Sequence, residues 1–305
     1  MSELRMGAPE WIMLILLSIV WGGSFFFAEI ALLAFGPLTI VAIRVFVGAV
    51  GLVVLARVLG HGLPTGAGAW RDLFVMGVLN NALPFSLIVW GQIHIDSGTA
   101  SILNGTTPFF TIFLAHFLLA GERMTAAKVV GIGLGIVGVA VLAGPSAIAG
   151  LTDSIQGQLA VLCAAISYAF AGVWGKRRLA GMAPLSAAAG MLVASSVLMI
   201  PLAIYGEGIP RVSVEWKIWG SLIGIGLLST SVAYLLYFKI LVAAGASNLL
   251  LVTMLIPVSA MLLGVMVLGE DIQPEALVGL AIIALGLAVI DGRPLHMLRR
   301  AGGGS

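Results

Sequence analysis

Residues 108–138 read PFFTIFLAHFLLAGERMTAAKVVGIGLGIVG, and residues 257–286 read PVSAMLLGVMVLGEDIQPEALVGLAIIALG. Each stretch runs from a proline to a Gly-Glu pair and then to two glycines. As patterns they are P-x12-GE-x8-G-x6-G and P-x11-GE-x8-G-x6-G, which differ by one residue of spacing. A pattern of this length that recurs once in each half of a chain indicates an internal repeat. We therefore expect two related halves, residues 1–146 and 147–300.

The composition is that of a membrane protein. Hydrophobic residues make up 60% of the chain and charged residues 9%, whereas a globular protein has about 25% charged residues. A helix of about 20 apolar residues crosses the ~30 Å hydrocarbon layer. The sequence predicts an all-α membrane protein with ten transmembrane helices, at 11–33, 37–59, 70–91, 97–119, 125–144, 156–178, 184–206, 217–242, 246–268 and 274–291.

The distribution of Lys and Arg predicts the orientation. Twelve of them fall on the side of the N-terminus, and Arg211 and Lys217 fall on the opposite side. By the positive-inside rule, both termini are then cytoplasmic. Five spans per half is an odd number, so the second five-helix repeat is inverted relative to the first. Residues 301–305, AGGGS, are typical of an artificial linker and are left out of the repeat.

The two halves also align outside the opening pattern. Phe35-Gly-Pro37-Leu38 matches Met182-Ala-Pro184-Leu185 at an offset of 147, which places Trp21 on Tyr168. Inverted repeats recur among secondary transporters, whose substrate binds near the midplane between the repeats. Ten helices in two inverted repeats, each closed by the P…GE…G…G pattern, resemble the EamA-type drug/metabolite transporter superfamily over essentially the whole chain.

Within that superfamily the chain is similar to the YddG-like bacterial amino-acid exporters. This resemblance implies export of small metabolites, foremost amino acids, across the bacterial cytoplasmic (inner) membrane by alternating access, without a cofactor. The partners it implies are a small-molecule substrate and the lipid bilayer, with no nucleic acid, and a monomer is compatible with it. Spans one, three, four, six, eight and nine are expected to line the cavity, with spans five and ten as scaffold.

Three prolines lie inside predicted spans. A helix-interior proline orphans the carbonyl four residues earlier, so Pro84, Pro108 and Pro257 free the carbonyls of Asn80, Asn104 and Thr253. Freed backbone at membrane depth is tolerated against protein or a water-filled cavity. The prolines therefore indicate either kinks that border a cavity or kinks alone, with neighbouring hydroxyls taking up the carbonyls.

Polar side chains gather on the third and fourth spans. Ser101, Asn104 and Thr107 recur at helical spacing and share a face, and Asn80 is followed directly by Asn81. Such residues either join helices by hydrogen bonds or line a polar cavity. Two adjacent asparagines favour the cavity.

Aromatic residues occupy equivalent positions in the two halves. Trp21 corresponds to Tyr168 and Phe85 to Tyr234, with Tyr237 three residues further on. Aromatic faces hold apolar groups or cations, and the alternative role is anchoring at the membrane interface. Because Trp21 and Tyr168 lie well inside their spans, cavity lining is the better explanation for them.

Two charged residues lie in the first two spans. Arg44 is roughly 10 Å deep, and an intramembrane charge is a functional candidate whose partner has to be named. Glu29, at the end of span one, is the expected partner. The alternatives for Arg44 are an anchor for a substrate carboxylate or a side chain that reaches the membrane surface. No His, Cys, Asp or Glu set has metal-ligand spacing.

The Gly-Glu pairs are interpreted as structural. Glu122 and Glu270 each precede the N-terminus of the next helix, where a carboxylate complements the helix dipole. The glycines of 131–138 and 279–286 suit close helix packing. Because no carboxylate lies at mid-membrane, we expect facilitated transport or weak proton coupling. Alternatives to an amino-acid exporter are an efflux transporter for toxic organic cations, an intramembrane enzyme and a channel.

Overall fold

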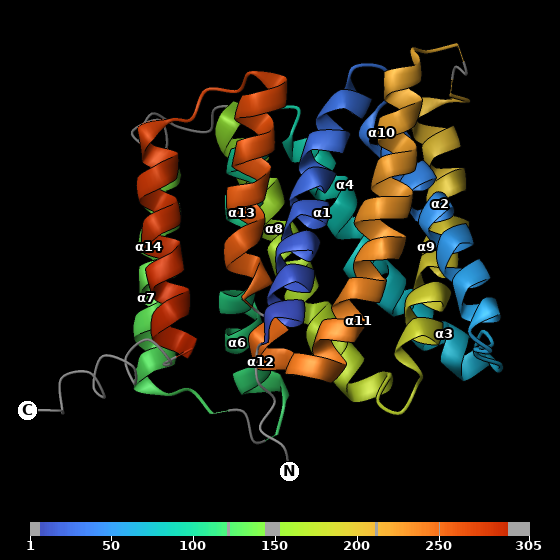
Figure 1. Ribbon diagram of the computed structural model, residues 1–305, viewed down its shortest axis with the longest axis horizontal. Coiled ribbons are helices and arrows are strands. Elements are labelled where there is room, and N and C mark those ends of the chain that lie inside the picture. Colours follow the sequence, from blue (N-terminus) through green and yellow to red (C-terminus); the bar gives the residue numbers. More distant parts are fainter. Residues whose placement is uncertain (1–6, 121–122, 144–152, 211–212, 250, 292–305) are drawn as a thin grey trace, which may run out of the picture.

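The protein folds as a bundle of helices (Figure 1). The computed structural model describes residues 7–120, 123–143, 153–210, 213–249 and 251–291, and all regular structure in those ranges is helical. In chain order the α-helices are α1 (Ala8–Leu32), α2 (Pro37–Val58), α3 (Ala67–Gly77), α4 (Leu83–Gly91), α5 (Ser97–Asn104), α6 (Thr107–Leu118), α7 (Ala126–Ala143), α8 (Asp153–Arg178), α9 (Pro184–Glu207), α10 (Trp216–Gly226), α11 (Ala233–Ala244), α12 (Ala246–Leu249), α13 (Val252–Leu263) and α14 (Pro274–Asp291). Short π-helices form η1 (Val78–Ala82), η3 (Leu227–Val232) and η4 (Gly264–Leu268).

The predicted all-α membrane protein is confirmed. Seven segments of the described chain are long and apolar enough to cross a membrane, and three further apolar helices are shorter. Together they correspond to the ten predicted spans, of which spans three, four, eight and nine are built from more than one helical piece. Glu122, the repeat boundary at 146–147 and the tail 301–305 lie outside the described residues.

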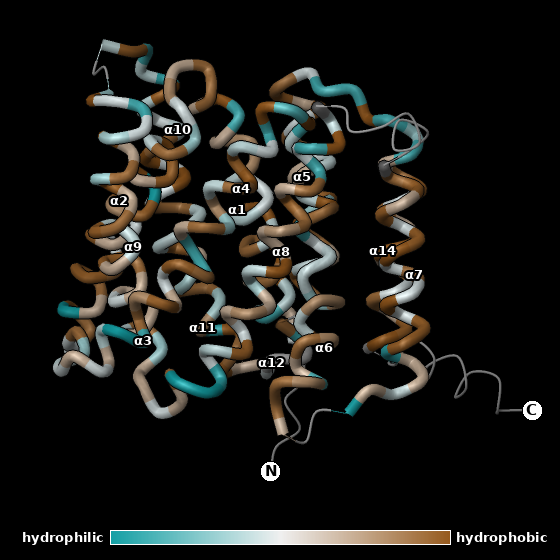
Figure 2. The backbone as a smooth tube through the Cα atoms, turned by 180° about the vertical axis from the view of Figure 1, so that it is seen from behind, coloured by the Kyte–Doolittle hydropathy of each residue, from teal (hydrophilic) through white to brown (hydrophobic). Residues whose placement is uncertain are grey.

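The outer surface of the bundle is apolar. Along α1, the exposed side chains Ile12, Ile15 and Ile19 follow one another at helical spacing. Figure 2 shows apolar residues along the helix shafts and polar residues gathered at the helix ends. In water such a surface would be an association site. On a bundle of membrane-spanning helices it is the surface that contacts lipid.

Helices α2 and α9, which are equivalent in the two halves, lie side by side and antiparallel. The amides of Leu38 and Thr39, in the first turn of α2, donate to the Glu207 carboxylate at the end of α9, each at 2.9 Å. The first amides of a helix have no partner within the helix, and an anion there also complements the dipole. Gly36 leaves room for this carboxylate, because a Cβ at Gly36 would collide with it.

Helices α7 and α14 form the second antiparallel pair, at one edge of the bundle (Figure 1). Their contacts explain the repeated glycine spacing. Gly131 packs on Gly286 and Gly138 packs on Gly279, so the first glycine of each pattern meets the second glycine of the other. Small residues of this kind let helix backbones approach closely in a membrane.

The two antiparallel pairs establish that the halves are inverted. Spans two and seven are equivalent, as are spans five and ten, and the members of each pair run in opposite directions. The remaining contacts follow the same symmetry. Span one (α1) packs on span nine (α13), and its equivalent, span six (α8), packs on span four (α5 and α6). Likewise α1 packs on span eight (α10 and α11), and α8 packs on α4 of span three. The prediction of inverted five-helix repeats is confirmed.

The spans around the bundle centre are interrupted at equivalent places. In spans three and eight, the π-helices η1 and η3 precede α4 and α11, although only η1 is followed by a proline, Pro84. Span four breaks at Gly105-Thr106, just before Pro108, and Pro257 lies within α13. The break of span four packs on α13, because a Cβ at Gly105 would lie 3.5 Å from Pro257 Cγ and 3.5 Å from the Thr253 carbonyl oxygen.

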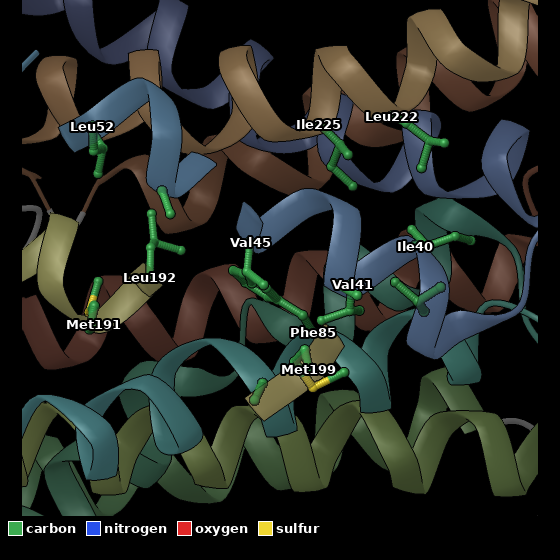
Figure 3. Packing of buried hydrophobic residues seen from close by; sticks show 14 of the residues in the cluster. Ile40, Val41, Val45, Leu52, Phe85, Met191, Leu192, Met199, Leu222 and Ile225 are labelled. Carbon is green, nitrogen blue, oxygen red and sulfur yellow. The ribbon is translucent and has the colours of Figure 1, made fainter. Parts of the chain in front are cut away.

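Two hydrophobic clusters surround the centre of the bundle. One joins α2, α4, α9 and α10, and Figure 3 shows Val41 and Val45 of α2 together with Phe85 of α4 and Leu192 of α9 in it. The other joins α1, α5, α8 and α13 with α7 and α14. Tyr168 of α8 is packed against both clusters. The central cavity of the protein lies where the two clusters meet.

Candidate functional site

A cavity of about 500 Å³ lies between the two repeats. Its walls come from α1, α2, the segments around η1 and η3, α5, α6, α8, α9 and α13, while α7 and α14 contribute no lining residue that the structure describes. The expected scaffold role of spans five and ten agrees with this arrangement. Spans two and seven, which were not expected to line the cavity, contribute Arg44 and, from α9, Pro184, Ala187, Ala188 and Met191.

Most of the site residues expected from the sequence are brought together in this cavity. The residues that line it share aromatic rings, amides or hydroxyls and come from both halves. They are Trp21, Asn80, Phe85, Asn104, Thr107, Tyr168, Tyr234, Tyr237 and Thr253.

One wall of the cavity is aromatic. The rings of Trp21 and Tyr237 have centroids 5.9 Å apart, Phe238 is 5.3 Å from Tyr237, and Tyr234 stacks on Phe238 at 5.9 Å. The wall thus joins α1 of the first half to α11 of the second. Because a helix turns through 100° per residue, residues 234, 237 and 238 share one face of α11. Such rings offer an apolar side chain a large contact area.

Asn80 connects the amides to this aromatic wall. Its Nδ2 donates to the Tyr234 hydroxyl at 3.2 Å and lies 3.9 Å from Met191 Sδ. The neighbouring residue, Asn81, does not line the cavity: it is fully buried, and its Nδ2 donates to Ser195 Oγ at 3.2 Å. Adjacent residues on a helix point in different directions, so only one of the two asparagines can face the cavity. Asn81 joins η1 to α9.

Ser101 is also placed away from the cavity. It is fully buried and donates to the carbonyl oxygen of Gly98 at 2.6 Å. The helical spacing from Ser101 to Thr107 indicated a common face, but α5 ends at Asn104, and the turn at Gly105 alters the direction of the chain. Only Asn104 and Thr107 of the three line the cavity.

The three prolines are placed beside the cavity without lining it. The Asn104 carbonyl, freed by Pro108, accepts a hydrogen bond from Thr107 Oγ1 at 2.7 Å. A neighbouring hydroxyl therefore takes up the freed carbonyl, and both residues still line the cavity. The two interpretations of this kink are compatible here. Pro84 is followed by the lining residue Phe85. Pro257 lies near two lining residues, Thr253 and Ile256.

Glu29 and Arg44 do not form the expected pair. No ion pair joins them in the described chain. The Arg44 guanidinium carbon lies 3.6 Å from the centre of the Phe85 ring, and its Nε donates to Thr230 Oγ1 at 3.4 Å. Glu29 instead accepts from Gln92 Nε2 at 3.1 Å. Both residues belong to membrane-spanning helices, but Arg44 lines the central cavity and Glu29 lines another.

A second, more polar cavity lies near the end of α1. Its volume is about 510 Å³, and its lining includes Glu29, His94, Asp96, Gln158 and Glu275. Partial burial, and then the nearby carboxylates of Glu270 and Asp271, raise the pKa of Asp96 above its ordinary value. Asp96 immediately precedes α5, outside the helical spans.

Gln92 lines both cavities and was not among the expected site residues. It is 3% exposed, and its Nε2 donates to the Phe25 carbonyl oxygen at 2.9 Å as well as to Glu29. Gln92 Oε1 and Asn104 Oδ1 are buried acceptors that have no hydrogen-bond donor within the described residues. Both oxygens are enclosed by protein in this structure. Gln92 follows a predicted span end, where a polar residue is ordinary, so its sequence carried no signal.

Glu270 has a structural role, but not the one expected. Its carboxylate accepts from the Ser97 amide at 3.1 Å and from Ser97 Oγ at 2.8 Å, at the start of α5. It therefore stabilises the N-terminus of span four, in the other half, rather than that of the following helix α14. The sequence indicated the right kind of interaction and the wrong helix, because the contact is made only in the folded bundle.

Comparison with known proteins identifies the class of protein to which this architecture belongs. The model of the EamA-like transporter family matches the chain twice, at residues 9–144 and 155–291. The chain therefore belongs to the EamA-like transporter family, as the resemblance of its repeated pattern implied.

Relatives named as transporters match almost the whole chain. A probable terminal-alkyne amino-acid exporter of Streptantibioticus cattleyicolor is 30% identical, over 94% of this chain and 95% of its own. The uncharacterized transporter YoaV of Bacillus subtilis is 27% identical, over 90% of this chain and 94% of its own. The uncharacterized inner membrane transporter YedA of Escherichia coli is 26% identical, over 90% of this chain and 88% of its own. A solved crystal structure, 19% identical, matches the fold with a TM-score of 0.67 over 93% of this chain and 97% of that one.

Proposed function

We propose that this protein exports small metabolites, foremost amino acids, by alternating access through the central cavity. The observation that carries the proposal is the position of the cavity, which lies between two inverted repeats and is lined from both. Exchanging the conformations of two such halves would open the same cavity to the other side of the membrane. The lack of lining residues from α7 and α14, within the described chain, supports their role as a scaffold during that exchange.

The proposed orientation has both termini in the cytoplasm of a bacterial cell, with the chain in the inner membrane. The excess of Lys and Arg on that side supports it. In this orientation the central cavity extends to Leu179, Met182 and Pro184, at the cytoplasmic junction of α8 and α9. Gln92 lies between it and the second, more polar cavity, which is then on the outer side. This arrangement is the one expected of an inward-facing transporter.

Two features support amino acids as substrates. The cavity combines an aromatic wall, suited to a side chain, with amides and one guanidinium, suited to polar ends. One relative that matches almost the whole chain bears the name of a probable amino-acid exporter. Efflux of organic cations is the competing function within this class. Against it, the described lining includes no carboxylate and does include Arg44, which would repel a cation.

Counterflow into liposomes tests the proposal. Purified protein is reconstituted, the liposomes are loaded with one unlabelled solute of a panel of amino acids and organic cations, and entry of the labelled solute is followed. We expect counterflow of a subset of amino acids, and none in liposomes without protein. Counterflow of organic cations alone would replace the proposed substrate class, and the absence of counterflow for the whole panel would contradict the proposed transport function.

A further inference from the structure

Arg44 carries the only formal charge in the central cavity among the described residues that line it. The side chain is 7% exposed and belongs to α2, a membrane-spanning helix. A buried charge is normally paired, because removing an ion from water costs several kcal/mol even after the protein relaxes. No carboxylate of the described chain forms an ion pair with Arg44. The cavity therefore holds a cation that has no counter-ion.

The neighbours of Arg44 hold it in place without neutralising it. Phe85 lies under the guanidinium plane, at 3.6 Å from its carbon to the ring centre, and the face of an aromatic ring attracts a cation. Thr230 Oγ1 accepts from Nε at 3.4 Å and donates its own proton to the Ile225 carbonyl oxygen at 2.9 Å. That carbonyl is five residues earlier, so the π-helix η3 sets the position of Thr230. The contacts fix the plane and the Nε end of the guanidinium.

The terminal nitrogens of the guanidinium are left for another acceptor. A guanidinium has five N–H donors in a fixed fork, and in the described chain only Nε has a hydrogen bond. Neither Nη1 nor Nη2 is among the fully enclosed polar atoms that lack a partner, so both have access to space, and Arg44 lines the cavity. The geometry of this fork matches the two oxygens of a carboxylate.

The repeat shows that the fold does not require a charge at this position. The offset of 147 that aligns Pro37 with Pro184 places Arg44 on Met191. Met191 lines the same cavity and lies near η1 through Asn80, as Arg44 lies near η3 through Thr230. An uncharged side chain is therefore accommodated in the equivalent environment of the other half. The charge of Arg44 makes an otherwise symmetric cavity asymmetric.

From these observations we infer that Arg44 binds a carboxylate of the transported molecule and makes the central cavity selective for solutes that carry one. This inference rests on the proposed transport function and specifies its substrates: amino acids and other carboxylates of similar size bind, and amines without a carboxylate do not. The carboxylate accepts hydrogen bonds from Nη1 and Nη2, while Phe85 contacts the face of the guanidinium and Thr230 accepts from Nε. The substrate supplies the missing counter-ion, so the buried charge is neutralised only when the site is occupied.

The experiment compares three probes that share a phenylethyl group. L-Phenylalanine carries both charges, 3-phenylpropanoate carries the carboxylate only, and 2-phenylethylamine carries the amine only. Binding to the full chain in lipid nanodiscs is followed by intrinsic fluorescence. We expect both carboxylates to bind about tenfold or more tightly than the amine, the range that a charge-assisted hydrogen bond supplies.

Two substitutions at Arg44 separate recognition from folding. Arg44→Met copies the residue of the equivalent position and should abolish the preference for carboxylates. Arg44→Lys keeps a positive charge without the fork and should retain the preference with weaker binding. Arg57→Met, which removes an exposed charge at the end of the same helix, is the matched control and should leave all three affinities unchanged.

The inference is overturned if 2-phenylethylamine binds the unaltered protein as tightly as 3-phenylpropanoate, or if Arg44→Met leaves their ratio unchanged. If Arg44 had only a structural role, Arg44→Met would lower the affinities for all three probes together. Because binding in nanodiscs does not depend on movement across a membrane, these outcomes are distinct from a failure of the proposed transport function. Counterflow that occurs regardless of the charge of the solute would leave transport standing and remove the role of Arg44.

Discussion

Gly131 of α7 and Gly286 of α14 pack backbone to backbone. A Cβ at Gly131 would lie 2.6 Å from the Gly286 carbonyl oxygen, and a Cβ at Gly286 would lie 2.7 Å from that of Gly131. Gly138 and Gly279 make the equivalent contact one heptad away, with corresponding distances of 3.0 and 2.9 Å. The two glycines of each repeated pattern are thus the residues through which the repeats approach most closely at this edge of the bundle.

Gly131→Ala should lower the melting temperature, because the added methyl group meets backbone, which cannot rotate away. Gly133→Ala is the matched control, since a Cβ at Gly133 meets nothing within 4 Å. Replacing a helical glycine by alanine otherwise gains about 1 kcal/mol, so Gly133→Ala should be neutral or stabilising. Thermal unfolding in one detergent measures both. Equal melting temperatures for the two variants would contradict the close approach.

Glu207→Gln should also lower the melting temperature. The Glu207 carboxylate accepts from two amides at the start of α2, and loss of a helix cap costs about 1 kcal/mol. Glutamine keeps one acceptor oxygen and loses the charge. Glu215→Gln, which removes an exposed ion pair with Lys217, should have a much smaller effect. A similar loss in both variants would show that Glu207 contributes only as a surface charge.

Asn104→Ala should reduce transport and leave the melting temperature close to that of the unaltered protein. Asn104 lines the cavity, and its Oδ1 has no donor in the described chain. Asn81→Ala should instead lower the melting temperature, because it removes the hydrogen bond to Ser195 between η1 and α9 and leaves a cavity in place of a fully buried side chain. Counterflow and thermal unfolding are measured on both. Unchanged transport in Asn104→Ala would exclude contact with the substrate.

A pH gradient should not drive strong accumulation of the substrate. In the described lining of the central cavity no carboxylate is present to carry a proton with the substrate, and Glu29 lines the second, more polar cavity instead. Liposomes that are acidic on one side provide the measurement, with an ionophore that collapses the gradient as the control. Uphill accumulation that disappears with the ionophore would contradict facilitated transport.

Asp96→Asn should raise the melting temperature at neutral pH and have little effect at acid pH. The pKa of Asp96 is raised by partial burial and by Glu270 and Asp271, so the folded protein binds this proton somewhat more tightly than the unfolded chain does. Ionisation therefore destabilises the fold as the pH rises above the ordinary value of about 3.9. Asparagine removes that cost. Thermal unfolding from pH 4 to pH 7 tests this, and a gain that grows toward low pH would have the wrong sign.

The parts of the fold that could be predicted depend on patterns of residue type and spacing. Apolar length located the spans, and the spacing of prolines and glycines located the repeat. The aromatic residues of the cavity were found because equivalent positions in the two inverted halves line the same cavity. Trp21 and Tyr168 are an example. Neither residue alone indicates a cavity, but the offset of 147 residues between the halves shows that they occupy equivalent positions.

The residues that were placed wrongly depend on directions that a spacing pattern does not contain. Asn81 was expected beside Asn80, but one step along η1 turns it toward Ser195. Ser101 shares a helical face with Thr107 only if the helix is continuous, and it ends at Asn104. Glu29 was paired with Arg44 as the nearest opposite charge in sequence. In the folded protein Glu29 accepts a hydrogen bond from Gln92, and the Arg44 guanidinium lies over the Phe85 ring.

The crosswise contact of α7 and α14 also bears on how such a chain can arise. Both of its glycine contacts are the same contact, in which the first glycine of one pattern meets the second glycine of the other. One five-helix sequence is therefore enough to encode both sides of the interface. A half-length ancestor inserted into the membrane in both orientations could form it with its own copy. Gene duplication and fusion would then fix the orientations and allow the two halves to differ in sequence, as they do at Arg44 and Met191.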